Sequence, residues 1–323
     1  MRVVVTGGAG FVGRAVVERL RDRGDDVIAL VRDPGAATHL VHERVTPIRS
    51  SLADPGSMRD AMRGADAVIH IAGMYRIGIA KADRPAMWDA NVGVTERVLD
   101  AAIAERVGRI LYVSTVNVFG DTKGAVVDET YHRDLAQGFT SWYDETKFRA
   151  HEAAEARIAA GAPIVIVMPS QVYGPHDHSL TSEQLHRAFH GTMRYLVLTS
   201  VGLGWVHVHD LADGMLSALD RGRAGDLYCL SGPNHTLAES IAIAAGLGGT
   251  RPPRFSMPTA LARLVAPLND ALGGLPGSPP NLAETIRSAD GVTYYATAAK
   301  AHRELGFMPR SLEQGIVDTW GRH

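Results

Sequence analysis

Short runs of β-branched and aliphatic residues, separated by segments long enough to be helices, are the feature that most constrains the fold of this chain. The runs are continuously apolar, as strands must be when helices cover both faces of a sheet. They lie at residues 2–6, 27–31, 67–72, 109–115 and 163–169. The segments between them have helical periodicity, as in Phe11, Ala15, Val16 and Leu20. This alternation predicts an α/β fold with a doubly wound parallel sheet.

The sequence changes in character after "VYGP" at residues 172–175, where segments become shorter and richer in Gly and Pro. We therefore predict a parallel-sheet domain over residues 1–170, its last elements partly completed by later segments. A smaller, mostly helical lobe is predicted over residues 171–323. A Pro/Gly loop is expected at 273–281. Helices are expected in the lobe near residues 181–190, 236–246, 257–270 and 311–320.

The length, charge and cysteine content of the chain indicate which classes of protein it can belong to. The 323 residues suffice for a large α/β domain with extensions. The 33 Lys and Arg and 35 Asp and Glu give a formal charge of -2, which argues against a nucleic-acid or membrane-surface partner. The single cysteine, Cys229, lies in the apolar run "LYCL" and is expected in a buried strand, so a disulfide within the chain is excluded. Without a long apolar segment, we expect a cytoplasmic protein.

The stretch "VTGGAGFVG" at residues 5–13 places Gly7, Gly10 and Gly13 directly after a strand and at the start of a helix. Glycines permit a tight turn and the close approach of the backbone to a pyrophosphate. The N-terminus of the following helix supplies unpaired N–H groups and a partial positive charge. The turn, which includes Phe11 and Val12, therefore predicts that the first domain binds a dinucleotide.

The end of the second strand predicts which dinucleotide is bound. An acidic residue at this point bonds the ribose hydroxyls of NAD, whereas an arginine accommodates the 2′-phosphate of NADP. Here Val31 occupies the expected acidic position and Arg32 follows it. We therefore favour NADP(H) over NAD(H), although Asp33 complicates the choice and Arg32 has an alternative role as a solvated loop cation.

The stretch "SWYDETK" at residues 141–147 places Tyr143 and Lys147 one helical turn apart. With 9 tyrosines and 4 lysines in the chain, about 0.1 such pairs are expected by chance. The pair opens an expected helix over 143–160, so both side chains project from one helical face. The alternative is a surface turn with a weak ion pair between Asp144 and Lys147.

Proton transfer is the chemistry that this pair supports. A phenol exchanges protons poorly at neutral pH, and we expect the nearby ammonium of Lys147 to lower the pKa of Tyr143. Tyr143 then exchanges a proton with a substrate oxygen while a hydride moves to or from a nicotinamide. Ser114 and Thr115 end a strand at the edge of the sheet where ligands bind, so their hydroxyls can hold the reacting oxygen or merely cap the strand.

Seven segments occur in the order and spacing of one known family, which the chain resembles over nearly its whole length. They are "TGGAGFVG", "IHIAG", "NVGVT", "VSTVNVFG", "YDETK", "PSQVYGP" and "VHVHDLADG". The family is the extended short-chain dehydrogenase/reductases. The C-terminal third is most similar to the branch of dihydroflavonol-4-reductase-like proteins, 3β-hydroxysteroid dehydrogenases and NAD-dependent epimerase/dehydratases.

The resemblance implies a Rossmann-type domain and a role for each matching residue. Tyr143 is the expected catalytic acid/base, and Lys147 holds the nicotinamide ribose and tunes the phenol. The catalytic hydroxyl falls on Thr115, with Ser114 beside it. The remaining positions expected to line or support the cofactor site are Ser51, Leu52, Ile71, Ala72, Gly73, Asn91, Val113, and the backbone from Pro169 to Val172.

Departures from the family pattern limit what the resemblance implies. Ser51 and Leu52 stand where the family often has an aspartate before the adenine contact. Sugar-nucleotide 4,6-dehydratases carry an Asp-Glu pair where this chain has Val116 and Asn117, so we disfavour dehydration. Arg194 is the main cation available to bind a diphosphate, which weakens the hypothesis of a sugar-nucleotide substrate.

Fewer sequence features point to the substrate pocket and to the subunit interface. Gln171 and Arg194, with the aromatic residues Tyr75, Tyr173 and Trp205, are candidates for the pocket, although core packing equally explains the aromatic residues. His207 and His209, placed on one face of a strand by alternation, are expected to be structural supports beside Asp210 rather than metal ligands, and we predict no metal. The resemblance also implies a homodimer formed by helices at 86–106 and 143–160.

Three functions remain open from the sequence. The first is an NADP(H)-preferring oxidoreductase that interconverts a carbonyl and an alcohol on a moderately apolar small molecule. The second is a nucleotide-sugar epimerase, which uses the same residues to oxidise and re-reduce one carbon. The third is a catalytically silent NAD(P)-sensing protein, against which the intact set of Thr115, Tyr143 and Lys147 argues.

Overall fold

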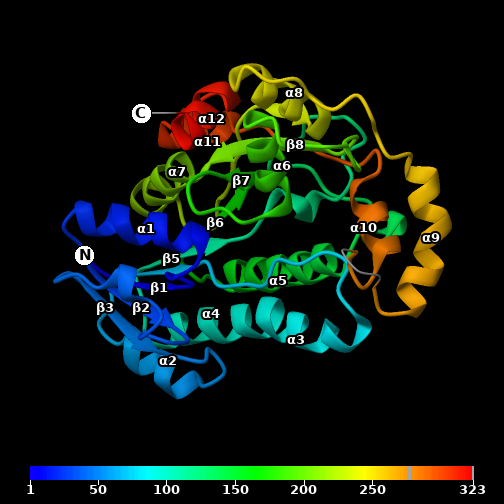
Figure 1. Ribbon diagram of the computed structural model, residues 1–323. Coiled ribbons are helices and arrows are strands. Elements are labelled where there is room, and N and C mark those ends of the chain that lie inside the picture. Colours follow the sequence, from blue (N-terminus) through cyan, green and yellow to red (C-terminus); the bar gives the residue numbers. More distant parts are fainter. Residues whose placement is uncertain (275–277, 322–323) are drawn as a thin grey trace.

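A seven-stranded parallel sheet forms the centre of the molecule (Figure 1). The computed structural model describes residues 1–274 and 278–321. In spatial order the strands are β3 (Val45–Arg49), β2 (Asp26–Val31), β1 (Arg2–Thr6), β4 (Ala67–His70), β5 (Arg109–Val113), β6 (Ile164–Pro169) and β9 (Leu227–Leu230). The order reverses between β1 and β4, which is the switch point of a doubly wound sheet. The predicted fold class is confirmed.

Helices cover both faces of this sheet, and each face has its own apolar core. One face packs against α1 (Phe11–Asp22), α7 (Val208–Arg221) and α11 (Ala299–Leu305). The other packs against α2 (Pro55–Met62), α4 (Val94–Ala104) and α5 (Trp142–Ala159). Successive residues of β1 alternate between the two cores, with Val3 and Val5 in the first and Val4 in the second. Continuous apolar strands are therefore required by burial on both sides.

The expected strands at 67–72 and 109–115 are shorter in the structure. β4 ends at His70 and β5 at Val113, because the residues that follow leave the sheet at its carboxyl edge. The expected helix at 86–106 is divided into α3 (Arg84–Trp88), a π turn (Asp89–Gly93) and α4. Short 3-10 turns lie at Thr38–Leu40, Lys81–Asp83, Val116–Phe119 and Leu135–Gln137.

The C-terminal half builds a second, smaller layer above the carboxyl edge of the sheet (Figure 1). Its four strands are β7 (Gln171–Tyr173), β8 (Gly202–His207), β10 (Asn234–Thr236) and β11 (Thr293–Tyr294). Its helices are α6 (Leu180–Phe189), α8 (Leu237–Leu247), α9 (Thr259–Ala271), α10 (Leu282–Ala289) and α12 (Leu312–Trp320). Strand β9, helix α7 and helix α11 return from this half to the main sheet.

Cys229 and the expected Pro/Gly loop at 273–281 are two further features predicted from the sequence. Cys229 is fully buried in β9, as expected. Part of the expected Pro/Gly loop at 273–281 lies outside the described residues, which exclude 275–277. Over the described part of the chain, we find no helix with the length and apolarity needed to span a bilayer.

Candidate active site

Tyr143, Lys147 and Thr115 come together at the carboxyl edge of the main sheet. Tyr143 and Lys147 lie on one buried face of α5, and each is 8% exposed. Thr115 follows β5 and lies beside Tyr143, while its Oγ1 donates to Oδ1 of Asn117 at 3.1 Å. Thr115 also caps the 3-10 turn at Val116–Phe119, which is one of the two roles considered from the sequence. A phenol, a hydroxyl and an amine therefore share one small site.

The protonation of Tyr143 differs from the sequence-based expectation. Burial raises the pKa of Tyr143 far above its usual value, and the nearby Thr115 hydroxyl opposes this only in part. Lys147 does not lower it, because its Nζ donates to the Val113 carbonyl at 3.2 Å and lies 5.3 Å from the centre of the Tyr112 ring. Tyr143 consequently keeps its proton at neutral pH and is arranged as a proton donor.

Lys147 is affected by the same burial. Desolvation lowers the pKa of its amine to about 8, since the apolar surroundings disfavour the charged form. The Val113 carbonyl is the hydrogen-bond acceptor that remains available to it. Lys147 is therefore close to losing its charge in the physiological range.

Ser114 faces away from the phenol. Its Oγ is 2.9 Å from Nδ1 of His151, which lies one turn beyond Lys147 on α5. This hydrogen bond joins the end of β5 to the middle of the helix. Of the two hydroxyls considered from the sequence, the structure brings Thr115 to Tyr143 and engages Ser114 elsewhere.

Asn91 joins α5 to the segment that follows β4. It lies in the π turn, and its Nδ2 donates to the Met74 carbonyl at 3.0 Å and to Oγ1 of Thr146 at 2.9 Å. Its Oδ1 accepts from the Met74 amide at 2.6 Å. An ideal Cβ on Gly73 would lie 3.1 Å from that oxygen, so the chain passes close to the amide here. Asn91 thereby fixes the strand-end segment against the first turns of α5.

The glycine turn after β1 forms a cradle that side chains would fill. A Cβ on Gly7 would lie 2.8 Å from the Ala72 amide, and one on Gly13 would lie 2.0 Å from the Gly7 carbonyl. Gly10 caps α1 without a side-chain hydrogen bond, which leaves the helix terminus open to a ligand. The residues present therefore fit a dinucleotide pyrophosphate, with Phe11 and Val12 in the first turn of α1 and Ile71 beside Gly7.

The end of β2 offers a free cation. Arg32 is exposed and forms no ion pair or hydrogen bond with any described residue. Asp33 is engaged by Arg49, whose Nη2 lies 3.3 Å from its Oδ1. Ser51 is exposed nearby, and Leu52 adopts a left-handed conformation with φ of 56°. Asp33, which complicates the cofactor choice, is thus paired with a cation. Arg32 has no such partner among the described residues.

The residues expected in the substrate pocket separate into two groups. Tyr75 packs edge-on against Tyr143, with ring centres 4.8 Å apart, and it is 54% exposed. Tyr173 and Trp205 pack edge to face within the apolar core. For these two aromatic residues, the structure favours the alternative of core packing.

The other pocket and cofactor candidates lie on segments of both layers. Gln171 and Val172 are half-buried in β7, and Pro169 ends β6. Arg194 is exposed between α6 and β8. Their contact with a ligand stays a prediction.

A buried ion pair, missed from the sequence, fixes the first turn of α5. Asp144 and Arg133 are 0% and 5% exposed, and Nη1 of the arginine lies 2.7 Å from Oδ1 of the carboxylate. Asp144 also accepts from the Thr140 amide at 2.9 Å, and the guanidinium lies 4.5 Å from the centre of the Phe139 ring. Asp144 therefore pairs with Arg133, and the expected alternative of a surface pair with Lys147 is absent from the described residues.

His207 and His209 do not share a strand face, contrary to the expected alternation. His207 ends β8 and His209 lies in α7, because that helix begins at Val208. Burial lowers the pKa of His207 to about 4. Asp210 beside them is bonded by Arg310 at 2.7 Å. No group of three or more potential metal ligands gathers in residues 1–274 and 278–321.

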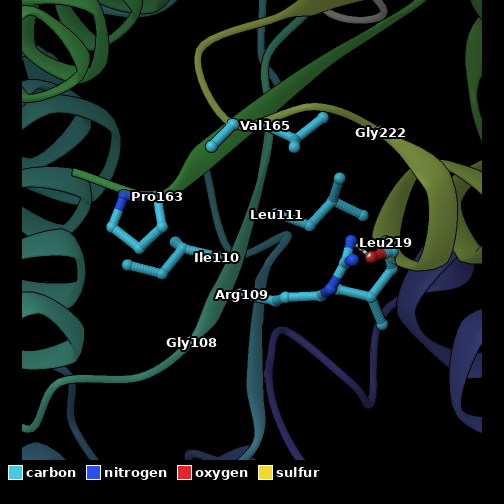
Figure 2. Close-up of a pocket in the computed structure, with 9 residues that line it drawn as sticks. Gly108, Arg109, Ile110, Leu111, Pro163, Val165, Leu219 and Gly222 are labelled. Atoms are coloured by element: carbon cyan, nitrogen blue, oxygen red, sulfur yellow. Dashed lines mark hydrogen bonds between the residues drawn. The ribbon is translucent and has the colours of Figure 1, made fainter. Parts of the chain in front are cut away.

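The pocket drawn in Figure 2 lies at the opposite edge of the sheet. It is lined by Gly108, by Arg109 at the start of β5 and by Pro163 just before β6. The Arg109 guanidinium is occupied there, since its Nη1 donates to the Leu219 carbonyl at 2.6 Å. The pocket is therefore separate from the group around Tyr143.

Replacing Asp144 by alanine should strongly destabilise the protein. The change leaves the Arg133 guanidinium buried without its carboxylate, which typically costs about 3–5 kcal/mol. Urea denaturation measures the free energy of unfolding. The control is Glu152→Ala on the same helix, whose exposed pair with Arg149 should contribute less than about 0.5 kcal/mol. A loss below about 1 kcal/mol for Asp144→Ala would show that the ion pair does not stabilise this turn.

Replacing Lys147 by methionine should change how stability depends on pH. The pKa of Lys147 is lower in the folded state than in the unfolded chain, so the unfolded state binds more protons above pH 8 and wild type gains stability as the amine is neutralised. The free energy of unfolding of Lys147→Met, relative to wild type, should therefore fall by about 2 kcal/mol between pH 7.5 and 9.5. Urea titrations across this range measure it.

Exposed Lys81 provides the control for the pH experiment. Lys81→Met leaves the buried amine of Lys147 in place, so this variant should give a pH profile parallel to that of wild type. If Lys147→Met also gave a parallel profile, Lys147 would not be desolvated in the folded protein.

Comparisons with known proteins show what this chain is similar to. The family model described as "NAD dependent epimerase/dehydratase family" matches residues 3–230. A Synechocystis sp. protein named as a provisional dihydroflavonol 4-reductase is 31% identical, over 98% of this chain and 92% of its own length. The 4-hydroxy-2-methyl-3-oxo-4-farnesyl-3,4-dihydroquinoline-1-oxide ketoreductase of Stigmatella aurantiaca is 30% identical, over 99% of this chain and 95% of its own length.

A solved structure is similar to this chain in both sequence and fold. The crystal structure of gox2253 is 30% identical and superposes with a TM-score of 0.82, covering 98% of this chain and 96% of the other. The resemblance expected from the seven sequence segments is thereby confirmed. The chain belongs to the NAD-dependent epimerase/dehydratase family, the extended short-chain dehydrogenase/reductases.

Proposed function

We propose that this protein is an NADP(H)-preferring oxidoreductase that interconverts a carbonyl and an alcohol on a moderately apolar small molecule. The observation that carries the proposal is the buried phenol of Tyr143, which lies beside Thr115 at the carboxyl edge of the sheet and whose pKa is raised by burial. Carbonyl reduction needs a proton donor at the reacting oxygen, and burial keeps Tyr143 in the donor form. Family membership supports a nicotinamide-dependent enzyme.

The chain's own groups have separate tasks in this reaction. The bound nicotinamide cofactor supplies or accepts the hydride. Thr115 orients the carbonyl oxygen, and the hydroxyl of Tyr143 donates the proton that converts the developing alkoxide into an alcohol. Lys147 would then contact the ribose from the same helical face. In the oxidation direction the phenolate of Tyr143 would accept the proton of the alcohol, which restores the phenol.

The substrate class rests on the stretch 193–205, in which Arg194 is the single cation, and on one relative. Arg194 is an exposed cation of the lobe, and Tyr75 offers an aromatic surface against Tyr143. The Stigmatella relative is named as the ketoreductase of a farnesylated dihydroquinoline oxide, whose farnesyl group is a hydrocarbon chain. These observations favour an apolar carbonyl over a sugar diphosphate.

An epimerase acting on a nucleotide sugar is the second candidate. Arg76 favours it, because this exposed arginine follows Tyr75 and has no partner among the described residues. With Arg194 it would give the site two cations for a diphosphate. The epimerase would consume no net NAD(P)H, which separates the two candidates in a coupled assay.

Tyr143→Phe should reduce the turnover of NADPH with a carbonyl substrate by about 10²–10⁴-fold, because the ring remains and the proton donor is lost. NADPH binding, followed by fluorescence titration, should be unchanged. Tyr195→Phe is the control, since Tyr195 is exposed in the lobe. This variant should turn over NADPH at the wild-type rate. Turnover retained by Tyr143→Phe would remove Tyr143 from the mechanism.

Arg32→Ala should weaken NADPH binding by about 10–100-fold, the effect of losing a charge-assisted contact with the 2′-phosphate. NADH has no such phosphate, so its affinity for the variant should equal that for wild type. Fluorescence titration of both proteins with both cofactors measures this. Tighter binding of NADH than of NADPH by wild type would overturn the cofactor preference.

The subunit arrangement is also part of the proposal. Helices α4 and α5 lie side by side on the outer face of the sheet (Figure 1), as the helices of a two-fold interface would. We place a homodimer interface there, on the strength of the family resemblance. A cytoplasmic location stays a prediction from the sequence.

A further inference from the structure

A buried carboxylate of the lobe contacts both segments that carry the aromatic residues of the site. Glu284 lies in α10 and is 1% exposed. Its Oε1 accepts from the amides of Trp142 and Gly78, each at 3.2 Å. Its Oε2 accepts from Nη2 of Arg84 at 3.4 Å and from Nδ2 of Asn281 at 3.2 Å. One side chain therefore satisfies donors from four segments.

The first of these contacts completes the N-terminus of the catalytic helix. The first amides of a helix have no acceptor within it. Ser141 accepts from the Asp144 amide inside α5 at 3.1 Å, whereas the Trp142 amide finds its acceptor in Glu284, 142 residues away. A carboxylate at this position also complements the helix dipole. The residue that precedes Tyr143 is thus fixed from the lobe.

The second contact fixes the loop that carries Tyr75. Gly78 has φ of 72°, its amide donates to Glu284, and its carbonyl accepts from the Asn281 amide at 2.9 Å. A Cβ at Gly78 would lie 2.4 Å from Oγ1 of Thr285, so the loop lies directly on the start of α10. Tyr75 is three residues away and packs against Tyr143.

Other residues of the lobe strengthen this junction. Nε of Arg287 donates to the Thr140 carbonyl at 3.0 Å, and the Tyr294 hydroxyl lies 3.0 Å from Oγ1 of Thr140. Figure 1 shows α10 beside the N-terminal end of α5. Thr140 lies just before α5, so the lobe contacts the start of this helix through three side chains.

We propose that Glu284 is a positioning residue through which the substrate lobe sets the relative placement of Tyr143 and Tyr75. This inference rests on the proposed function, because the placement matters only if Tyr143 delivers the proton to a substrate beside Tyr75. Small displacements of a proton donor reduce turnover steeply, while the distant glycine turn and its cofactor contacts are unaffected.

The test compares two substitutions at Glu284 with a matched glutamate. Glu284→Ala removes all four contacts, and Glu284→Gln keeps one oxygen but turns an NH₂ group toward the donors of Arg84 and Asn281. Glu239 is the control, because it is also the third residue of a lobe helix and accepts from its own N-cap residue, Thr236, within the lobe. Glu239→Gln should leave turnover unchanged.

Hydrogen–deuterium exchange and steady-state kinetics give independent readouts. In Glu284→Ala the amides of Gly78 and Trp142 should exchange faster, kcat should fall about 10–100-fold and the NADPH Kd should be unchanged, with Glu284→Gln intermediate. Unchanged exchange at both amides would overturn the inference. So would a loss of cofactor affinity equal to the loss of kcat in Glu284→Gln, because that indicates general destabilisation.

The two proposals fail separately. If wild type reduced no carbonyl compound, the proposed function would fail, and the exchange of the two amides would still show whether Glu284 fixes these segments. If wild type is active and Glu284→Ala retains full kcat despite faster exchange, the positioning role is wrong and the proposed function stands.

Discussion

The first turn of α5 is the constraint on which the site depends. Tyr143 lies in this turn, where the backbone amides lack acceptors within the helix. Three parts of the chain supply what the turn needs. Ser141 caps it locally, Arg133 binds Asp144 from the preceding loop, and Glu284 accepts from Trp142 across the junction with the lobe. The position of the phenol is therefore a property of the folded protein rather than of the helix alone.

Burial of this turn also decides the chemistry of its side chains. Taking Tyr143 and Lys147 out of water disfavours the charged form of each, which raises the pKa of the phenol and lowers that of the amine. The same packing that orders the site thus keeps the phenol protonated. A site built in this way is suited to giving a proton to a developing alkoxide. Below pH 8 the buried amine of Lys147 is charged, and this lowers the stability of the folded protein.

Much of the fold and the centre of the site could be predicted from the sequence. Continuous apolar runs predict strands buried on both faces, and the glycine turn and the Tyr143–Lys147 pair lie in short segments whose geometry depends on near neighbours. Predictions that needed the distant environment were less successful. The pKa of Tyr143 moved opposite to the expectation because burial raises it and the amine of Lys147 does not oppose this. Trp205 lies in the core, since its strand pairs on both sides and buries it.

The sequence by itself determined the doubly wound sheet, the glycine turn after β1 and the placement of Tyr143 and Lys147 on one helical face, because strand and helix periods and local turn geometry act over a few residues. Only the tertiary structure decided which groups surround them. Glu284 lies 206 residues from Gly78, and Arg133 reaches Asp144 from a loop without regular periodicity. Such contacts follow from the docking of the lobe onto the sheet edge, where buried donors must find acceptors wherever the folded chain provides them.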